Sequence, residues 1–383
     1  TFLNKYVFFQ YEVRVNQLEN NIVKDHAYNI FLPEVESFYG LRLTQPLLRG
    51  GKRDANLAEV LSARHGAQVG KAELAAARLL LAGDVLSTYA DLLWHTKESR
   101  LRMEQAERLD KELNRMTTQV ERGQKSKEAL IAFEREANTA RDQFFLADLR
   151  KQRTHFSLRS LAGRNNLEEQ WVPQEGSLPS SPKLDRPSLI RQALVEHPRL
   201  VGAQFAYERE DALVVGARND KYPNLDLDFS IGYLGLNNDV SSSAKAVFES
   251  DRPELGVGLR FSYDLDNRKA KGALSEALAR RRQASLLLAR ARRSMISEIR
   301  QGFSDWEAAK IRIEQANSSL KIALAEYEAE KDRLEKGLAK PADSLPAFMG
   351  VVQAKSRLFE EENIRDKALI RLLATAGNIM EHL

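Results

Sequence analysis

The sequence predicts a mostly helical chain with a smaller β component, built from two similar halves. Two windows without proline, between Pro46 and Pro173 and between Pro253 and Pro341, are rich in Ala, Leu, Glu, Arg and Lys. These residues have the highest helix propensities. Segments in which apolar and polar residues alternate precede both windows, and such alternation indicates strands with one apolar face.

The clearer pair of strands lies in the second half. Alternation is strict from Asn224 to Tyr233 and returns from Leu255 to Tyr263, with a long polar loop between them. Strands of about 9 or 10 residues joined by such a loop have the length of a transmembrane β-hairpin. Residues 9–16 and 39–44 repeat the pattern more weakly. Aromatic residues near the strand ends would suit interfacial girdles: Phe8, Tyr39, Tyr233 and Tyr263.

Four strands do not make a complete fold. Soluble hairpins would need a partner layer, because an isolated hairpin is not stable in water. Small closed barrels need roughly eight strands or more. We therefore expect oligomerisation, and three chains would supply twelve strands.

The helices are predicted to be very long, from about residue 52 to 122 and from about 268 to 336. At 1.5 Å per residue each would measure roughly 100 Å, so a compact globular domain is excluded. Apolar residues from Ile299 to Tyr327 recur at steps of three or four, which indicates a seam packed on neighbouring helices. The helices alone would also suit an ordinary dimeric coiled coil.

Each long helix is expected to end at a turn and to be followed by a returning helix. Gly123 precedes a helix over residues 127–162, and Gly337 precedes one that reaches residue 376. Gly123 and Gly337 are 214 positions apart, as are Gly163 and Gly377. This period indicates duplication of a large unit. A further helix is expected over residues 188–221, ahead of the second hairpin.

Composition limits the chemistry. There is no cysteine among the 383 residues, and none of the six histidines forms a pair at metal-ligand spacing, so no metal site or cofactor is expected. No Ser-His-Asp order, glycine-rich phosphate loop or HExxH motif is present, and we do not expect an enzyme. The net charge of +4 gives no indication of nucleic-acid binding.

With this organisation the chain resembles the TolC-like outer membrane efflux protein family, also called outer membrane factors. Local signatures are Ala193–Leu200 (ALVEHPRL), Tyr222–Leu225 (YPNL) and Leu41–Gly51, which ends in QPLLRGG. The resemblance implies a homotrimer in which long antiparallel helices form an α-barrel and two β-hairpins per protomer form a 12-stranded β-barrel. It also implies a helix ahead of the first hairpin, which we expect to precede residue 1 together with any lipidated tail.

The implied function is a passive exit duct in the bacterial outer membrane, with its helical tunnel in the periplasm. Such a duct serves a tripartite efflux or type I secretion system. Its partners are a periplasmic adaptor (membrane fusion) protein, an inner-membrane transporter and outer-membrane lipid, with no nucleic acid. Drug, metal and protein export share this duct, so the substrate stays open. A cytoplasmic or periplasmic coiled-coil scaffold without channel activity is the alternative.

The resemblance divides the chain into six segments. These are residues 1–47, a first transmembrane β-hairpin; 48–163, a first long helical hairpin of the tunnel; 164–187, an irregular equatorial linker; 188–222, a tunnel helix; 223–265, a second transmembrane β-hairpin; and 266–383, a second long helical hairpin.

Three groups of residues are candidates for the function. Charged residues of the polar strand faces should line the barrel lumen, where they are either simply solvated or selective: Glu12, Arg14, Arg42, Asp226, Asp228 and Arg260. The helix tips resemble the family's adaptor contacts, although a glycine also explains a simple helix reversal: Arg122, Gly123, Gln124, Lys336, Gly337 and Leu338. Asp343 matches an acidic residue of the family's periplasmic gate. Pro346 and Leu334 replace a second acidic residue and a tyrosine of that gate.

Overall fold

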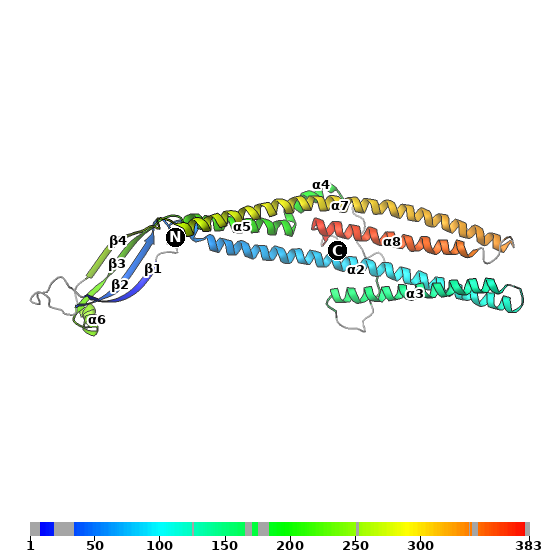
Figure 1. Cartoon of the computed structure of the whole chain (residues 1–383), viewed down its shortest axis with the longest axis horizontal. Coiled ribbons are helices and arrows are strands. Elements are labelled where there is room, and N and C mark those ends of the chain that lie inside the picture. The colour runs from blue at the N-terminus through cyan, green and yellow to red at the C-terminus, as the bar shows by residue number, and fades with distance from the viewer. Residues whose placement is uncertain are drawn as a thin grey trace, which may run out of the picture. The chain divides into compact units, whose positions relative to one another are not determined.

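The computed structural model describes residues 8–18, 34–124, 126–164, 171–174, 184–249, 253–336, 338 and 344–379. The chain divides into two compact units, residues 1–69 with 203–288 and residues 70–202 with 289–383. The described residues form four strands and eight helices (Figure 1).

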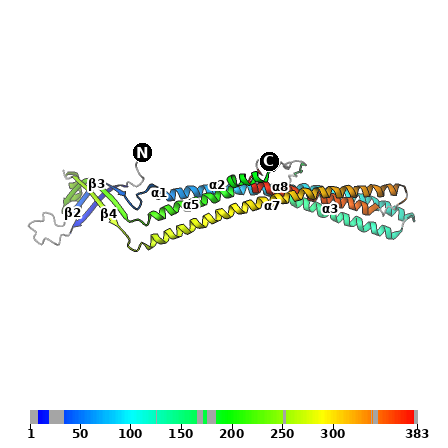
Figure 2. The same cartoon turned by 90° about the horizontal axis from the view of Figure 1, so that it is seen from above.

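The strands form one antiparallel sheet in the first unit (Figure 2). Its order is β1-β2-β3-β4, and the members are β1 (Phe8–Leu18), β2 (Glu34–Pro46), β3 (Asn224–Asn237) and β4 (Pro253–Ser262). Both segments of each predicted pair are therefore strands. The central pairing, β2 with β3, joins the two halves of the sequence, since the end of β2 at Pro46 and the start of β3 at Asn224 are 178 positions apart.

The two longest helices lie within the proline-free windows. The described helices are α1 (Arg53–Asn56), α2 (Ala58–Glu121), α3 (Lys127–Leu161), α4 (Arg186–Glu196), α5 (Pro198–Asn219), α6 (Val240–Glu249), α7 (Arg268–Glu335) and α8 (Ser344–Ala376). The prediction for residues 268–336 is confirmed to within one residue by the 68 residues of α7. The first long helix is interrupted once, because Leu57 separates α1 from α2.

In the helices that the structure describes, no stretch is both long and apolar enough to cross a membrane.

Two expectations were wrong in detail. The single helix predicted over residues 188–221 is broken at His197, which has extended backbone angles (φ −65°, ψ 125°). The cause is Pro198, because a proline disfavours helical geometry in the residue before it. The polar loop predicted between β3 and β4 contains a helix, α6, whose start is capped by Asp239 through backbone hydrogen bonds from Ser241 and Ser242, each 3.0 Å long.

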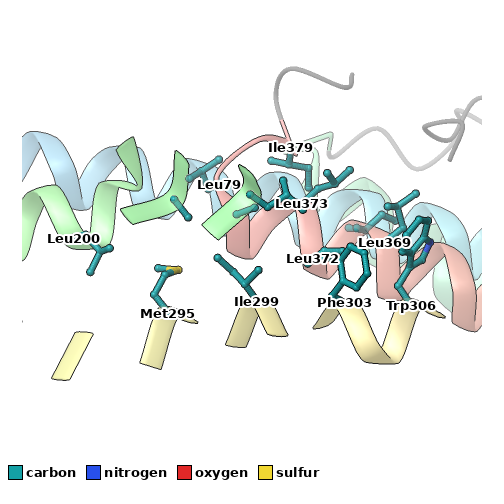
Figure 3. Packing of buried hydrophobic residues seen from close by; sticks show 14 of the residues in the cluster. Leu79, Leu200, Met295, Ile299, Phe303, Trp306, Leu369, Leu372, Leu373 and Ile379 are labelled. Atoms are coloured by element: carbon teal, nitrogen blue, oxygen red, sulfur yellow. The ribbon is translucent and has the colours of Figure 1, made fainter. Parts of the chain in front are cut away.

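The largest apolar core lies in the second unit, where α2, α4, α5, α7 and α8 contribute to it (Figure 3). The predicted seam of α7 supplies Ile299, Phe303 and Trp306, and Met295 one turn earlier joins them, all less than 9% exposed. They meet a row from α8 and from residues just beyond it: Leu369, Ile370, Leu372, Leu373, Ala376 and Ile379. Ala309, Ala316 and Ala323 continue the seam as buried residues. The near-heptad pattern of the sequence is thus confirmed as the packed side of α7.

The duplication appears in how the helices end. Gly123, Gly163 and Gly377 all have positive φ, between 67° and 87°. At each, the following amide donates to a carbonyl five residues earlier, as in a Schellman motif: Gln124 to Gln119, Arg164 to Arg159 and Asn378 to Leu373. Leu338 donates to Arg333 in the same way, and this pair lies 214 positions after Gln124 and Gln119. The internal repeat therefore holds at the level of individual hydrogen bonds.

His197 gives the second unit a dependence on pH. The side chain is 5% exposed, and its Nδ1 accepts a 3.1 Å hydrogen bond from the Arg199 amide. Burial, aided by the nearby charge of Arg199, lowers the pKa of His197, and a hydrogen bond with the Ala374 carbonyl opposes this shift. The unfolded chain then binds the proton more readily, so this contribution to stability is complete above about pH 6.5 and is lost as pH falls toward the lower folded pKa.

We expect the unfolding temperature to decrease as the pH is lowered from about 6.5. His197→Asn keeps a hydrogen-bond acceptor that does not titrate, so it should flatten this dependence. The flattening should be partial, because burial also lowers the pKa of His95 and His155. Thermal unfolding of both proteins across a pH series is the measurement. Parallel curves for the variant and the parent would exclude His197 as a source.

Candidate functional site: the two faces of the sheet and the helix tips

The strand register places the predicted lumen residues on one side of the sheet. Asp226 is paired with Arg260, and Arg42 with Ser230. Paired residues share a face, and every second residue along a strand does too. The rows containing Asp226, Asp228, Arg42 and Arg260 therefore belong to one face. The backbone of Glu12 pairs with Gly40 and that of Arg14 with Phe38, which are two and four residues before Arg42 on β2 and therefore belong to the same face. The side chains of β1 lie outside the described part of the structure.

Asp228 is the centre of a polar cluster that links three strands. Thr44 Oγ1, on β2, donates a 2.6 Å hydrogen bond to Asp228 Oδ1. Arg260 Nη2, on β4, lies 3.0 Å from Asp228 Oδ2. The Asp228 side chain is 17% exposed and that of Arg260 is 66% exposed. An ion pair this open to solvent contributes about 0–1 kcal/mol, so its main effect is to hold the two charges in fixed positions on the face.

The opposite face is apolar and largely uncovered. On β4, Leu255, Val257, Leu259 and Phe261 are each 66–71% exposed. On the neighbouring strands Leu41, Ile231 and Tyr233 are 50–52% exposed. A contiguous apolar surface of this kind marks an interaction with protein or lipid. The sheet therefore has one charged face and one apolar face, and only the first suits water.

The helix tips are open to solvent where the structure describes them. Arg122, Gly123, Gln124 and Lys336 are exposed, and Leu338 is 69% exposed. Gly337 and Asp343 lie outside the described residues. The two positions that replace family gate residues are described: Leu334 is half-buried and Pro346 is exposed.

On the same helices, the structure shows a cation–π cluster that the sequence did not predict. The Arg108 guanidinium of α2 lies 4.1 Å from the ring centre of Phe348 on α8 and 5.2 Å from that of Tyr327 on α7. Arg108 also donates a hydrogen bond to the Tyr327 hydroxyl. The sequence holds no signal for it, because the three residues lie on three helices.

A row of ion pairs between α2 and α8 was also missed. Lys367 Nζ lies 2.7 Å from Asp91 Oδ2, and Lys97 Nζ lies 2.9 Å from Glu362 Oε2. At the next residue of α2, Glu98 accepts a 3.0 Å hydrogen bond from the Ser356 hydroxyl on α8. These pairs fix the register of the two helices rather than forming a pocket for a ligand.

Comparison with known proteins extends this description. Residues 189–378 match the model of the outer membrane efflux protein family. No curated protein sequence matches the chain.

Solved structures of outer-membrane channels share the fold. OprN has a TM-score of 0.75 at 15% identity, over 97% of this chain and 81% of its own. VceC of Vibrio cholerae gives 0.71 at 16% identity, over 97% and 86%. MtrE of Neisseria gonorrhoeae gives 0.69 at 15% identity, over 98% and 82%. The family match and the shared fold confirm the resemblance seen in the sequence: the chain belongs to the outer membrane efflux protein family and has the mostly helical fold, with a small sheet, of TolC-type outer-membrane channels.

Proposed function

We propose that the chain is one protomer of a homotrimeric, passive exit duct in the bacterial outer membrane. The observation that carries the proposal is the two-faced sheet. Its apolar face exposes Leu255, Val257, Leu259 and Phe261, and its other face carries Asp228 and Arg260. Three such sheets joined edge to edge give twelve strands and remove the free edges, with lipid outside and water inside.

The six candidate lumen residues take their role from this arrangement. Glu12, Arg14, Arg42, Asp226, Asp228 and Arg260 would line the water-filled interior. Both charge signs occur among them, and Asp228 and Arg260 already neutralise each other in part. The proposed lumen therefore has no strong net preference for one sign, which suits a passive duct for varied solutes.

The long helices would form the periplasmic tunnel, following the six-segment division of the sequence. In this proposal a periplasmic adaptor contacts the tips at Arg122, Gly123, Gln124, Lys336, Gly337 and Leu338, and couples the duct to an inner-membrane transporter. The exposure of the described tip residues supports this role. A coiled-coil scaffold would account for the helices but would leave the bare apolar sheet face without a partner.

The assembly state tests the proposal. We expect a trimer of the 43.4 kDa chain in mild detergent, because four strands per protomer need three copies to reach twelve. Light scattering coupled to size exclusion, corrected for bound detergent, measures the mass. A monomer or dimer would contradict the duct.

The proposed gate residue gives a second prediction. Three copies of Asp343 around a threefold axis would form a ring of carboxylates, which attracts cations. Asp343→Ala should reduce cation preference and block by multivalent cations in planar bilayers. The effect should be modest, because Pro346 stands where the family has a second acidic residue. If Asp343 only stabilises the start of the returning helix, the reversal potential will be unchanged and thermal stability slightly lower.

A further inference from the structure

The helix α6 covers one end of the apolar face of the sheet. Its Ser243 hydroxyl lies 2.7 Å from the Ser37 hydroxyl and 3.0 Å from the Gly235 carbonyl oxygen. Ser37 and Gly235 are paired in the rows that continue to Tyr39 and Tyr233, so the helix lies on the apolar side. A side chain at Gly235 would come within 2.2 Å of the Ser243 carbonyl oxygen. Glycine is therefore what allows the helix to approach the strand this closely.

The helix itself is amphipathic. Ser243 and Val247 are 0% and 5% exposed against the sheet. Ser241, Lys245 and Glu249 occupy the exposed side. At the edges between the two sides, Val240 is 55% and Phe248 is 75% exposed. The capping carboxylate of Asp239 has its pKa lowered to about 2 by hydrogen bonds from Ser242 and Ser241, so the cap stays charged at ordinary pH.

The position of α6 along the strands is informative. The part of the apolar face that α6 leaves uncovered extends along β3 from Leu225 to Tyr233, nine residues, and a transmembrane strand needs about 9–11. The part covered by α6 begins immediately afterwards, at Gly235. Tyr39 and Tyr233, a pair in the register, lie at this boundary, and the Tyr39 ring is 5.3 Å from the Phe248 ring. Aromatic side chains concentrate where acyl chains meet headgroups.

We infer that α6 is an interfacial helix that binds the lipids of the outer leaflet. The exposed Val240 and Phe248 contact acyl chains at the boundary between acyl chains and headgroups, and Lys245 faces the headgroup phosphates. The helix thereby sets the depth at which the sheet sits in the membrane. This inference rests on the proposed function, because it needs the bare apolar face to be in lipid and the strand ends opposite the long helices to face outward.

The test uses the fact that the chain contains no cysteine. Single cysteines at Phe248, Lys245, Val257 and Gly258 would carry a nitroxide label in the full chain reconstituted in phospholipid vesicles. Val257 marks the centre of the apolar face, since it pairs with Phe229. Gly258 is the adjacent residue on the polar face, where a side chain would meet nothing within 4 Å. Phe248 is exposed, so its replacement should not unfold the helix. Accessibility to oxygen, which concentrates in lipid, is compared with that to a water-soluble nickel chelate.

We expect the oxygen-to-nickel ratio at position 248 to be several-fold higher than at 258, and lower than at 257. The label at 245 should report a shallower depth than the one at 248. A label at 248 as accessible to nickel as the one at 258, with 257 in lipid, would overturn the inference and leave the proposed function standing. Low accessibility to both reagents at 248 would overturn it in favour of a protein contact. Nickel access at 257 would contradict the proposed function itself.

Discussion

Val257→Arg should prevent formation of the membrane-inserted protein, whereas Gly258→Arg on the next residue should be tolerated. Val257 is 71% exposed and lies opposite Phe229, at the centre of the bare apolar face. An arginine at the midplane of a lipid-facing strand costs about 2–4 kcal/mol. In a trimer this cost would be incurred in every protomer, and it competes with a total stability of only about 5–15 kcal/mol for a typical protein.

Gly258→Arg is the matched control. It adds the same side chain to the same strand one residue later, on the face that carries Arg260 and Asp228. Yield of heat-resistant oligomer in outer-membrane fractions, followed by urea unfolding in vesicles, compares the two variants. Equal stability of both would mean that the apolar face does not contact lipid, because a charge on a water-exposed surface is nearly neutral.

Trp306→Ala should strongly destabilise the second unit. Trp306 is 4% exposed, and its ring packs edge-on against Phe303 with 5.7 Å between centres. Lys310 Nζ lies over the same ring, 3.9 Å from its centre. Truncation of a buried Trp or Phe to alanine costs about 3–5 kcal/mol, through lost burial and the cavity that remains.

Ile311→Ala provides the comparison on the same helix, because Ile311 is 57% exposed. It should change stability by a few tenths of a kcal/mol, about what is usual for surface sites. Guanidinium unfolding followed by helical circular dichroism measures both. If Trp306→Ala were no more destabilising than Ile311→Ala, the packing of α7 on α8 would not be the main source of stability in this unit.

The elements predicted best are those whose patterns are long. The 68-residue α7 and the buried seam from Ile299 onward follow from helix propensity and periodicity summed over many residues. The strands β3 and β4 follow from strict alternation. Alternation does not determine which strand of the first half pairs with which strand of the second. The contact between Thr44 and Asp228, 184 residues apart in the chain, therefore appeared only in the structure.

The misses have local physical causes. Residues 237–243 were interpreted as a polar loop because of their Asn, Asp and Ser residues, yet Asp239 and the serines after it form the cap and first turn of α6. The apolar spacing of Val240, Ala244 and Val247 was the signal that could have shown the helix. The dipeptide His197-Pro198 indicates the break, but the residues on both sides favour helix, so helix propensity alone predicts one continuous helix. The sequence predicted the two faces of the sheet, because these depend on alternation. It did not predict the contacts of Arg108, because these depend on packing between helices.

The most direct test of the central claim, a lipid-facing and a pore-lining face on one sheet, is the conductance of single-cysteine channels in a planar bilayer. A charged, membrane-impermeant thiol reagent should reduce the current through Gly258→Cys channels, since this side chain would project from the polar face into open space. The same reagent should leave Val257→Cys channels unchanged, because Val257 lies on the apolar face. Block of the Val257→Cys channels with no effect on Gly258→Cys would contradict the account, as would the absence of any conductance in both.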